Sequence, residues 1–249
     1  MQKLSVKIRQ RETPFFAFLY NIAFRLKRIN MPYFLLPFYR VIGLLRRGLI
    51  NSGRRISAFI YYEPMFRSQC KRVGRNLNYV KTRQGYPYFH GPVCIYLGDN
   101  VTIHGRTAFT AASLLDNPSF TVGDNTSLGP SLSVSIVKEI SIGAYCLIGT
   151  NVRITDNDGH PIDFIKRANG ATIDLEDAKP VKIGNNVWIG EGVSILKGVS
   201  IGKGAIIGAR SVVTHDIPPF AIVAGNPACF IKEASLVGKT PNTSQHEIS

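Results

Sequence analysis

Aliphatic residues recur every six positions through the second half of the chain. The clearest series is Ile183, Ile189, Ile195, Ile201, Ile207 and Val213. A second series lies four residues after each of these, at Val187, Val193, Val199, Ala205, Ser211 and Ile217, with serine as its one polar member. A helix would require a period near 3.6, and an ordinary sheet a period of two. The pattern therefore predicts a solenoid, in which each hexapeptide forms a short strand and a turn and three hexapeptides form one triangular coil.

The same register extends towards the N-terminus and is interrupted once. Ile136, Ile142, Ile148 and Ile154 continue it, and weaker starts occur at Val122 with Leu128 and at Leu97 with Ile103. Turn-forming triplets at 98–100, 123–125 and 184–186 supply the positive φ angles that tight bends need. The interruption, residues 155–182, is polar and glycine-containing. We expect it to be a functional loop over the surface, since long loops inside compact repeats usually have a function.

The two ends of the chain differ from the repeats. Residues 218 and 219 are both proline, which ends the pattern because proline cannot donate to a strand ladder. A short strand is expected at 221–224, and residues 238–249, rich in Ser, Thr, Asn and Gln, are expected to be a disordered tail. The predicted organisation is an N-terminal region at 1–75, a repeat domain at 76–237 containing the loop 155–182, and the tail.

Residues 1–75 carry the charge of the protein. They hold 16 Lys and Arg against Glu12 and Glu63, which accounts for the net charge of +14. Apolar residues at helical spacing over 14–29 and 32–60, edged by Arg and Lys, predict amphipathic helices. Such helices suit an anionic membrane surface. The alternative is that they pack on the solenoid or on a neighbouring subunit. No nucleic-acid partner is expected, because no nucleic-acid motif accompanies the charge.

No uncharged stretch near the N-terminus reaches the roughly 18 residues of a transmembrane helix, so none is expected. The four cysteines, Cys70, Cys94, Cys146 and Cys229, are widely separated and lack metal-ligand spacing. This pattern favours reduced thiols, without disulfides or zinc. The predicted location is cytoplasmic, peripheral on the inner face of the cell membrane.

Four stretches carry a resemblance to a known family. They are IGTNVRI (148–154), GHPI (159–162), IGNNVWIGEGVSILKGVSIGKGAIIGARSVVTHDIPPF (183–220) and VAGNPACFIK (223–232). In their order and spacing, residues 142–232 resemble the hexapeptide-repeat acetyltransferases, particularly the maltose and galactoside O-acetyltransferases and nodulation acetyltransferase. The resemblance implies an all-β fold, a left-handed parallel β-helix, with acetyl-CoA as the acyl donor bound between subunits of a homotrimer. Residues 1–96 have no counterpart in this family.

His160 matches the catalytic base of that family. A sugar hydroxyl is a poor nucleophile until a base with a pKa near neutrality takes its proton, and histidine is the natural choice. Among the five histidines only His160 lies in the loop 155–182. Asp156 and Asp158 are close enough in sequence to orient the imidazole, or they cap the turn.

The resemblance also implies an acetyl-CoA site. Trp188 would contact the pantetheine arm or pack at the trimer seam, and the backbone N–H groups near Gly190 and Glu191 would stabilise the oxyanion. The further cofactor-binding candidates, along the arm and at the adenosine and phosphates, are Gly208, Ala209, Thr214, His215, Asn226 and Lys232. Cys229 stands where relatives carry a cation. The acceptor-side asparagine of the sugar acetyltransferases falls near Ser131 or Ser133, so these two serines are the substrate-binding candidates and the acceptor cannot be carried over.

The leading hypothesis is acetyl-CoA-dependent O-acetylation of a saccharide hydroxyl, with a lipid-linked glycan or polysaccharide precursor as the acceptor. Two alternatives stay open: an N-acyltransferase acting on an amino sugar or using a longer acyl donor, and a non-catalytic assembly scaffold. A metal-dependent hydratase on the same fold would need three histidine ligands including an HxxxxH-like pair. The sequence has no such pair, so no metal site is expected.

Overall fold

The computed structural model of the chain describes residues 13–15, 17, 18, 20, 21, 36–80, 87–112, 114 and 117–234. They fall into two compact units, Met1–Arg55 and Ile56–Ser249. Most of the helix predicted at 14–29, and the tail predicted at 238–249, lie outside the described residues. The second predicted helix is present as α3 (Leu36–Ser57). No described helix combines the length and the apolar character needed to cross a membrane.

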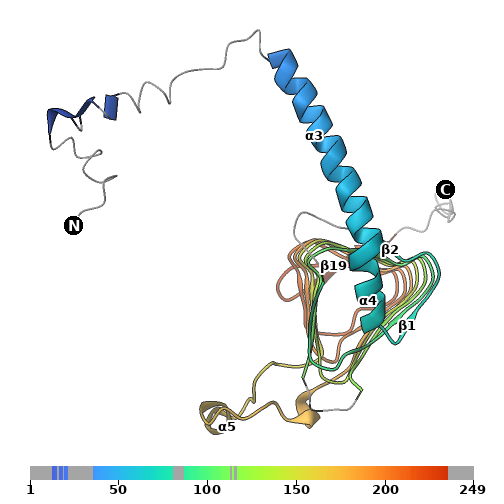
Figure 1. Cartoon of the computed structure of the whole chain (residues 1–249). Coiled ribbons are helices and arrows are strands. Elements are labelled where there is room, and N and C mark those ends of the chain that lie inside the picture. The colour runs from blue at the N-terminus through green and yellow to red at the C-terminus, as the bar shows by residue number, and fades with distance from the viewer. Residues whose placement is uncertain are drawn as a thin grey trace, which may run out of the picture. The chain divides into compact units, whose positions relative to one another are not determined.

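The second unit is the predicted left-handed parallel β-helix, whose cross-section is triangular (Figure 1). Sheet A contains β1 (Arg72–Val73), β4 (Cys94–Leu97), β7 (Ser119–Val122), β10 (Glu139–Ile142), β13 (Val181–Ile183) and β16 (Ser200–Ile201). Sheet B contains β2 (Asn78–Val80), β5 (Thr102–His104), β8 (Ser127–Leu128), β11 (Leu147–Ile148), β14 (Trp188–Ile189), β17 (Ile206–Ile207), β19 (Ala221–Ala224) and β20 (Cys229–Glu233). Sheet C contains β3 (Tyr88–His90), β6 (Ala108–Ala111), β9 (Ser133–Ile136), β12 (Arg153–Thr155), β15 (Ser194–Ile195) and β18 (Val212–Val213). Neighbouring strands are parallel, except that β20 runs antiparallel to β19.

The core consists of the residues that the six-residue register selects. Ile183, Ile189, Ile195, Ile201, Ile207 and Val213 are all between 0 and 4% exposed. Ser211, the polar exception, is also fully buried. Its hydroxyl donates to the Gly208 carbonyl at 2.7 Å and accepts from the Gly225 N–H at 3.1 Å, so burial leaves it satisfied.

The N-terminal coils are longer than the C-terminal ones. Lys182 pairs with Ser200, one coil of 18 residues, whereas Arg72 pairs with Tyr96 and Leu97 with Val122. Longer coils carry longer strands and aromatic core residues. This explains why the hexapeptide register weakens before Ile136.

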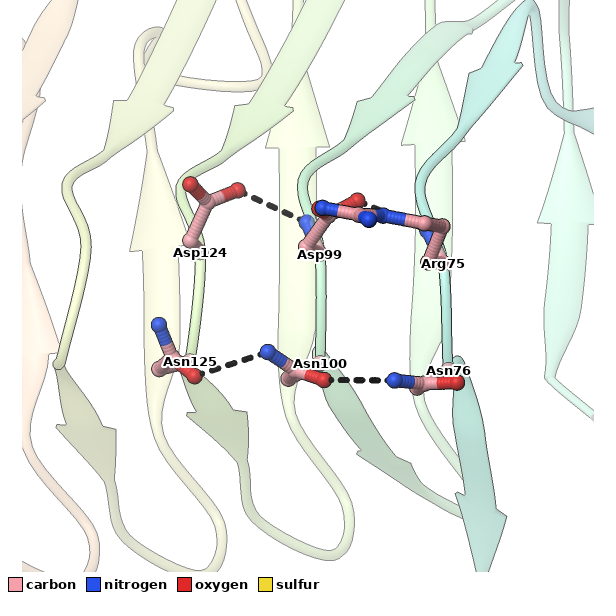
Figure 2. A network of polar contacts seen from close by, with 6 residues as sticks. All are labelled: Arg75, Asn76, Asp99, Asn100, Asp124 and Asn125. Atoms are coloured by element: carbon pink, nitrogen blue, oxygen red, sulfur yellow. Dashed lines mark hydrogen bonds and ion pairs between the residues drawn. The ribbon is translucent and has the colours of Figure 1, made fainter.

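Stacked polar side chains support the turns between sheets A and B at these longer coils (Figure 2). Asn76, Asn100 and Asn125 have positive φ angles of 55–56°. The Asn76 amide donates to Asn100 Oδ1, and the Asn100 amide donates to Asn125 Oδ1, each at 3.0 Å. Asparagine tolerates this backbone region better than most residues. The predicted turn positions at 98–100 and 123–125 are therefore confirmed.

A charged column lies beside the asparagine ladder (Figure 2). The backbone N–H of Arg75 donates to Asp99 Oδ1 at 2.7 Å, and the Arg75 guanidinium donates to Asp99 Oδ2 at 2.6 and 2.9 Å. The Asp99 N–H donates in turn to Asp124 Oδ1 at 2.7 Å. The hydrogen bonds and positive charge of Arg75 lower the pKa of the Asp99 carboxyl.

A short helical segment covers the first coil. It comprises the π-helix η2 (Ala58–Tyr62) and α4 (Glu63–Gln69), whose Phe66 is fully buried. From Phe66 a row of rings continues through Phe89 and Phe109 to Phe120, with centroid separations of 5.8, 5.4 and 5.2 Å. Residues 63–69 thus cap the solenoid, which begins at Arg72, slightly before the boundary predicted at residue 76.

The interruption of the repeat is a surface excursion, as predicted. It leaves sheet C at the end of β12 and returns at β13, and it contains α5 (Phe164–Ala168) and the 3-10 helix η3 (Leu175–Asp177). Figure 1 shows it projecting from the corner where sheets C and A meet, opposite sheet B. The Asp163 carboxylate accepts from the N–H groups of Ile165 and Lys166 and so fixes the start of α5.

Candidate active site

His160 lies exposed near the beginning of the excursion, after β12. No hydrogen bond joins its ring to another group in the described part of the chain. An accessible imidazole beside a corner of the solenoid suits a base that must reach a substrate hydroxyl. Its position in the predicted surface loop is confirmed, and its catalytic role stays a prediction.

Asp156 is held too tightly to orient His160. Its carboxylate is 0% exposed. It accepts from the backbone N–H groups of Val137, Lys138 and Glu139 at 2.7–3.0 Å and from the Asn157 side-chain amide at 2.9 Å. The three backbone donors lie on the preceding coil, where the chain passes from β9 into β10. Asp156 therefore anchors the start of the excursion to its neighbouring coil, which favours the second of the two predicted roles, that of capping a turn, over that of orienting His160.

Asp158 also has another partner. Its Oδ2 forms an ion pair with Lys197 Nζ, from the turn after β15 on the following coil. In between, Asn157 Oδ1 accepts from the Gly159 N–H at 2.9 Å, and the Thr155 hydroxyl donates to the Asn157 carbonyl at 2.6 Å. The segment before His160 is thus fixed to coils on both sides, which restricts the backbone that carries the imidazole.

A pocket of about 420 Å³ lies against this segment, at the corner between sheets C and A. We call it the corner pocket. Its polar lining includes His90, Thr110, Ser135 and Asn157, and Gly159, the residue before His160, forms part of its wall. Its apolar lining includes Val137 and Ile173, which pack together in a small cluster of buried residues.

The corner pocket offers other candidates than the two predicted acceptor residues, whose role stays a prediction. Ser131 occupies a turn with a φ of 59°, and Ser133 lies on β9. Neither serine lines the corner pocket, whereas Ser135, on the same strand and the same outward face as Ser133, does. Sequence reasoning missed His90, Ser135 and Asn157. The only signal in the sequence for this side of the pocket was the group of serines at 131–135, of which Ser135 lines it.

The residues predicted to hold the pantetheine arm lie on sheet B. Trp188 is 51% exposed on β14, and Leu147, its partner on the neighbouring strand, is 52% exposed. Large apolar side chains so exposed on adjacent strands form an unusually apolar outer face. Such a face suits contact with a pantetheine chain or with a second subunit, as predicted.

The backbone donors predicted for the oxyanion are not equivalent. The Gly190 N–H donates to the Ile207 carbonyl at 2.8 Å as part of the sheet ladder, so it is not available to an oxyanion. That part of the prediction is wrong. The Glu191 N–H has no acceptor within the described residues and remains the candidate donor.

Gly190 and Gly208 owe their identity to coil stacking. A Cβ on Gly190 would lie 2.6 Å from the Ala209 N, and a Cβ on Gly208 would lie 2.7 Å from the Ala224 Cβ. The close approach at these glycines is therefore made to the next coil of the same chain. Ala209 itself is exposed.

The remaining cofactor candidates occupy the C-terminal end of the solenoid. The Thr214 hydroxyl and His215 Nδ1 are hydrogen-bonded at 2.8 Å, and His215 is exposed. Asn226 lies in the exposed turn between β19 and β20, and Lys232 is exposed on β20. Cys229 is also exposed. The described residues include no group of three His, Cys, Asp or Glu side chains able to hold a metal ion.

Comparison with known proteins supports the interpretation of the repeats. The family described as bacterial transferase hexapeptide (six repeats) matches residues 180–215. Galactoside O-acetyltransferase of Escherichia coli strain K12 is 35% identical over 144 residues, which cover 57% of this chain and 58% of that protein. The chain belongs to the hexapeptide-repeat acetyltransferase superfamily.

Two further similarities concern another O-acetyltransferase and a solved structure. Polysialic acid O-acetyltransferase of Escherichia coli O1:K1 is 37% identical over 123 residues, which cover 48% of this chain and 38% of that protein. The chain thus spans less than two thirds of either O-acetyltransferase. The solved structure of AntD, an N-acyltransferase from Bacillus cereus, in complex with dTDP and 3-hydroxybutyryl-CoA, has a TM-score of 0.54 at 18% identity. It covers 70% of this chain and 88% of that chain, and at this identity the likeness shows a shared fold.

Proposed function

We propose that this protein transfers the acetyl group of acetyl-CoA to a hydroxyl of a saccharide, with His160 as the general base. The observation that carries the proposal is the position of His160: the family-matching histidine is exposed, on an anchored segment, one residue beyond the wall of the corner pocket. The two O-acetyltransferases to which the chain is similar act, by their names, on galactosides and on polysialic acid.

The chemistry follows from the groups that these elements present. His160 takes the proton of the acceptor hydroxyl as its oxygen forms a bond to the thioester carbonyl carbon. The carbonyl oxygen becomes negative in the tetrahedral intermediate, and the Glu191 N–H would donate to it. The carbon–sulfur bond then breaks, and the CoA sulfur leaves as a thiolate that receives the proton from His160. The products are the O-acetylated saccharide and CoA.

We further propose that the active site forms between subunits of a homotrimer. The excursion that carries His160 leaves the solenoid at the corner between sheets C and A. Trp188 lies on sheet B, which is the side of the triangle opposite this corner (Figure 1). A second copy that turned its sheet B towards this corner would complete the site. Its apolar face, with Trp188 and Leu147, would then be covered.

Mixing two inactive variants tests this arrangement. If each site takes His160 from one subunit and Trp188 from the next, trimers assembled from equal amounts of His160→Ala and Trp188→Glu chains regain about a quarter of the wild-type activity. Each variant alone stays inactive. If mass spectrometry shows that the trimers are mixed and they still have no activity, a shared site is refuted.

CoA release, followed with a thiol reagent, tests the function itself. His160→Ala is expected to lower kcat about 10²- to 10⁴-fold with an accepted saccharide. His104→Gln is the matched control, because this histidine lies on β5, outside the excursion. Turnover that is unchanged in His160→Ala would refute His160 as the general base, and no turnover by the wild type with any acceptor would support a non-catalytic scaffold. Amino sugars in the same assay distinguish N-transfer from O-transfer.

We propose that α3 attaches the protein to the inner face of the cell membrane, where a lipid-linked glycan would be its acceptor. Phe38, Leu45 and Ile56 lie on one side of this helix and are 59–63% exposed. Arg40 occupies a position on the opposite side, and the helix contains no acidic residue. Near an anionic surface each arginine contributes about 1 kcal/mol.

Two adjacent leucines give a matched test of membrane binding. Leu44 and Leu45 are 64 and 63% exposed, but they point about 100° apart around α3, and only Leu45 lies on the apolar side. In flotation with vesicles containing phosphatidylserine, Leu45→Ser is expected to reduce the bound fraction and Leu44→Ser to leave it nearly unchanged. Equal binding of both variants and the wild type would refute attachment through this face.

A further inference from the structure

The corner pocket extends over four successive coils. Gly159 and Asn157 follow β12, Ser135 lies on β9, Thr110 on β6 and His90 on β3. The pairing runs from His90 to Thr110 and from Thr110 to Ser135, so these side chains form one column on the outside of sheet C. Two strand spacings of about 4.8 Å separate His90 from Ser135, and a third leads to the coil that carries Asn157 and Gly159. The pocket therefore extends over about 14 Å, which is longer than a single pyranose ring.

The two sides of the corner pocket differ in chemistry. The sheet side carries hydrogen-bonding groups from His90, Thr110 and Ser135, and the side formed by the loops carries Leu114, Val137 and Ile173. Sugar rings present hydroxyl groups at their edge and C–H groups on their faces. A groove with one polar and one apolar wall therefore fits a saccharide that lies along it.

The distal end of the pocket has an aromatic extension. The His90 ring is nearly parallel to the ring of Tyr88, with an interplanar angle of 7° and centroids 6.4 Å apart. Both side chains are exposed, Tyr88 by 58%. Aromatic rings of this kind offer an apolar surface together with a polar group at the edge.

The backbone fixes this platform in place. Gly91, directly after His90, has a φ of +80° and lies so close to the Ala111 carbonyl that a Cβ would not fit. At the other end, Asn157 donates to Ser135 Oγ at 3.2 Å and accepts from the Gly159 N–H. The column is thus connected, by packing and hydrogen bonds, to the residue next to His160.

We infer that the acceptor is an oligosaccharide or polysaccharide chain, and that Tyr88 and His90 form a subsite for a sugar residue distant from the acetylated one. This inference rests on the proposed function, because it takes His160 as the reacting end of the groove. Both residues precede residue 96, in the part of the chain where the sequence showed no counterpart in the acetyltransferase family. The subsite therefore lies outside the stretches of sequence that carry the resemblance.

The test compares acceptors of different length. Wild type, Tyr88→Ala and His90→Ala are assayed for CoA release with glucose, galactose and N-acetylneuraminic acid, and with their homo-oligomers of three or more residues. The wild type is expected to prefer oligomers, and each substitution to raise KM for the oligomers by roughly 3- to 10-fold, the effect of one lost hydrogen bond or ring contact. KM for monosaccharides and kcat are expected to stay unchanged.

Matched variants separate this effect from a loss of folding. Tyr96→Ala removes an exposed tyrosine from sheet A of the same region and is expected to change no KM. His90→Gln, which keeps a hydrogen-bonding group, is expected to restore part of the oligomer preference. Three results would overturn the subsite. The wild type could use monosaccharides and oligomers equally well, it could turn over none of these sugars, or His90→Ala could raise KM equally for both lengths. Activity that does not depend on His160 would instead overturn the proposed function.

Discussion

Replacing Asp156 with asparagine keeps the size of the side chain and removes its charge. In the structure the buried carboxylate accepts from three consecutive backbone N–H groups, those of Val137, Lys138 and Glu139, and from the side chain of Asn157. An asparagine can offer only one oxygen to these donors. Its NH₂ group would point at N–H groups that also donate.

The size of the expected effect follows from burial. A hydrogen bond to a charged group contributes about 1.5–3 kcal/mol, and a buried donor without an acceptor costs about 1–3 kcal/mol. Val137 is 1% exposed, so its N–H would stay dry, whereas Lys138 and Glu139 are partly exposed and water can replace the lost oxygen. One buried unsatisfied donor and two weakened bonds together lower the free energy of unfolding by about 3–5 kcal/mol.

Urea unfolding followed by circular dichroism measures this loss. Asp158→Asn serves as the control, since it removes only a partly exposed ion pair with Lys197, which contributes about 0–1 kcal/mol. Hydrogen exchange should also accelerate at the amides of residues 137–139 in Asp156→Asn. A similar loss of stability in the two variants, or a loss below 1 kcal/mol in Asp156→Asn, would refute the anchoring role.

The same variant tests whether Asp156 acts on His160. Because its carboxylate contacts the preceding coil, Asp156→Asn should keep the wild-type pH dependence of kcat at a temperature where the protein is folded. A carboxylate that oriented the imidazole would stabilise its protonated form. In that case the substitution would move the lower limb of the pH profile to lower pH, contrary to our expectation.

Three further substitutions test the coils and turns. Gly208→Ala places a Cβ 2.7 Å from the Ala224 Cβ and should lower the free energy of unfolding by about 1–3 kcal/mol, measured in urea. Ser211→Ala removes the acceptor of the Gly225 N–H, which is exposed and can bind water instead, so it should cost only about 0.5–1.5 kcal/mol in the same assay. Arg75 lowers the pKa of the Asp99 carboxyl. The pair therefore stabilises the protein at pH values above the usual carboxyl pKa, and this stabilisation is lost as the pH falls through the lowered pKa. Arg75→Ala should therefore flatten the dependence of Tm on pH in that range, and an unchanged dependence would contradict the pairing.

The regular part of the fold could be predicted because every coil presents the same few inward positions to one core. Ile183 and Ile201 are buried by the same geometry one coil apart, so a fixed spacing of apolar residues is sufficient to locate them. The strand at 221–224 could be predicted for the same reason, since Val223 pairs with Ile207. The excursion was visible as the interruption of this spacing between Ile154 and Ile183.

The N-terminal coils and the corner pocket could not be predicted in this way. Strands such as β4 and β7 have four residues with two inward positions, and their coils are longer, so the six-residue spacing no longer applies. His90 and Asn157 lie far apart in sequence and line the same pocket only because intervening coils stack in a particular register. The partners of Asp156 are likewise on the preceding coil, whereas proximity in sequence pointed to His160.

The ladder that builds the solenoid also determines where its chemistry can lie. In the regular coils, backbone N–H groups in the strands and directly after them donate to the next coil, as Leu147 does to Val187 and Gly190 to Ile207. These donors are unavailable to a substrate, and their side chains point alternately into the core. Reactive groups must therefore come from turns, such as the Glu191 N–H, or from a place where the ladder is interrupted. The excursion after β12 is such a place, and this is where the chain carries His160.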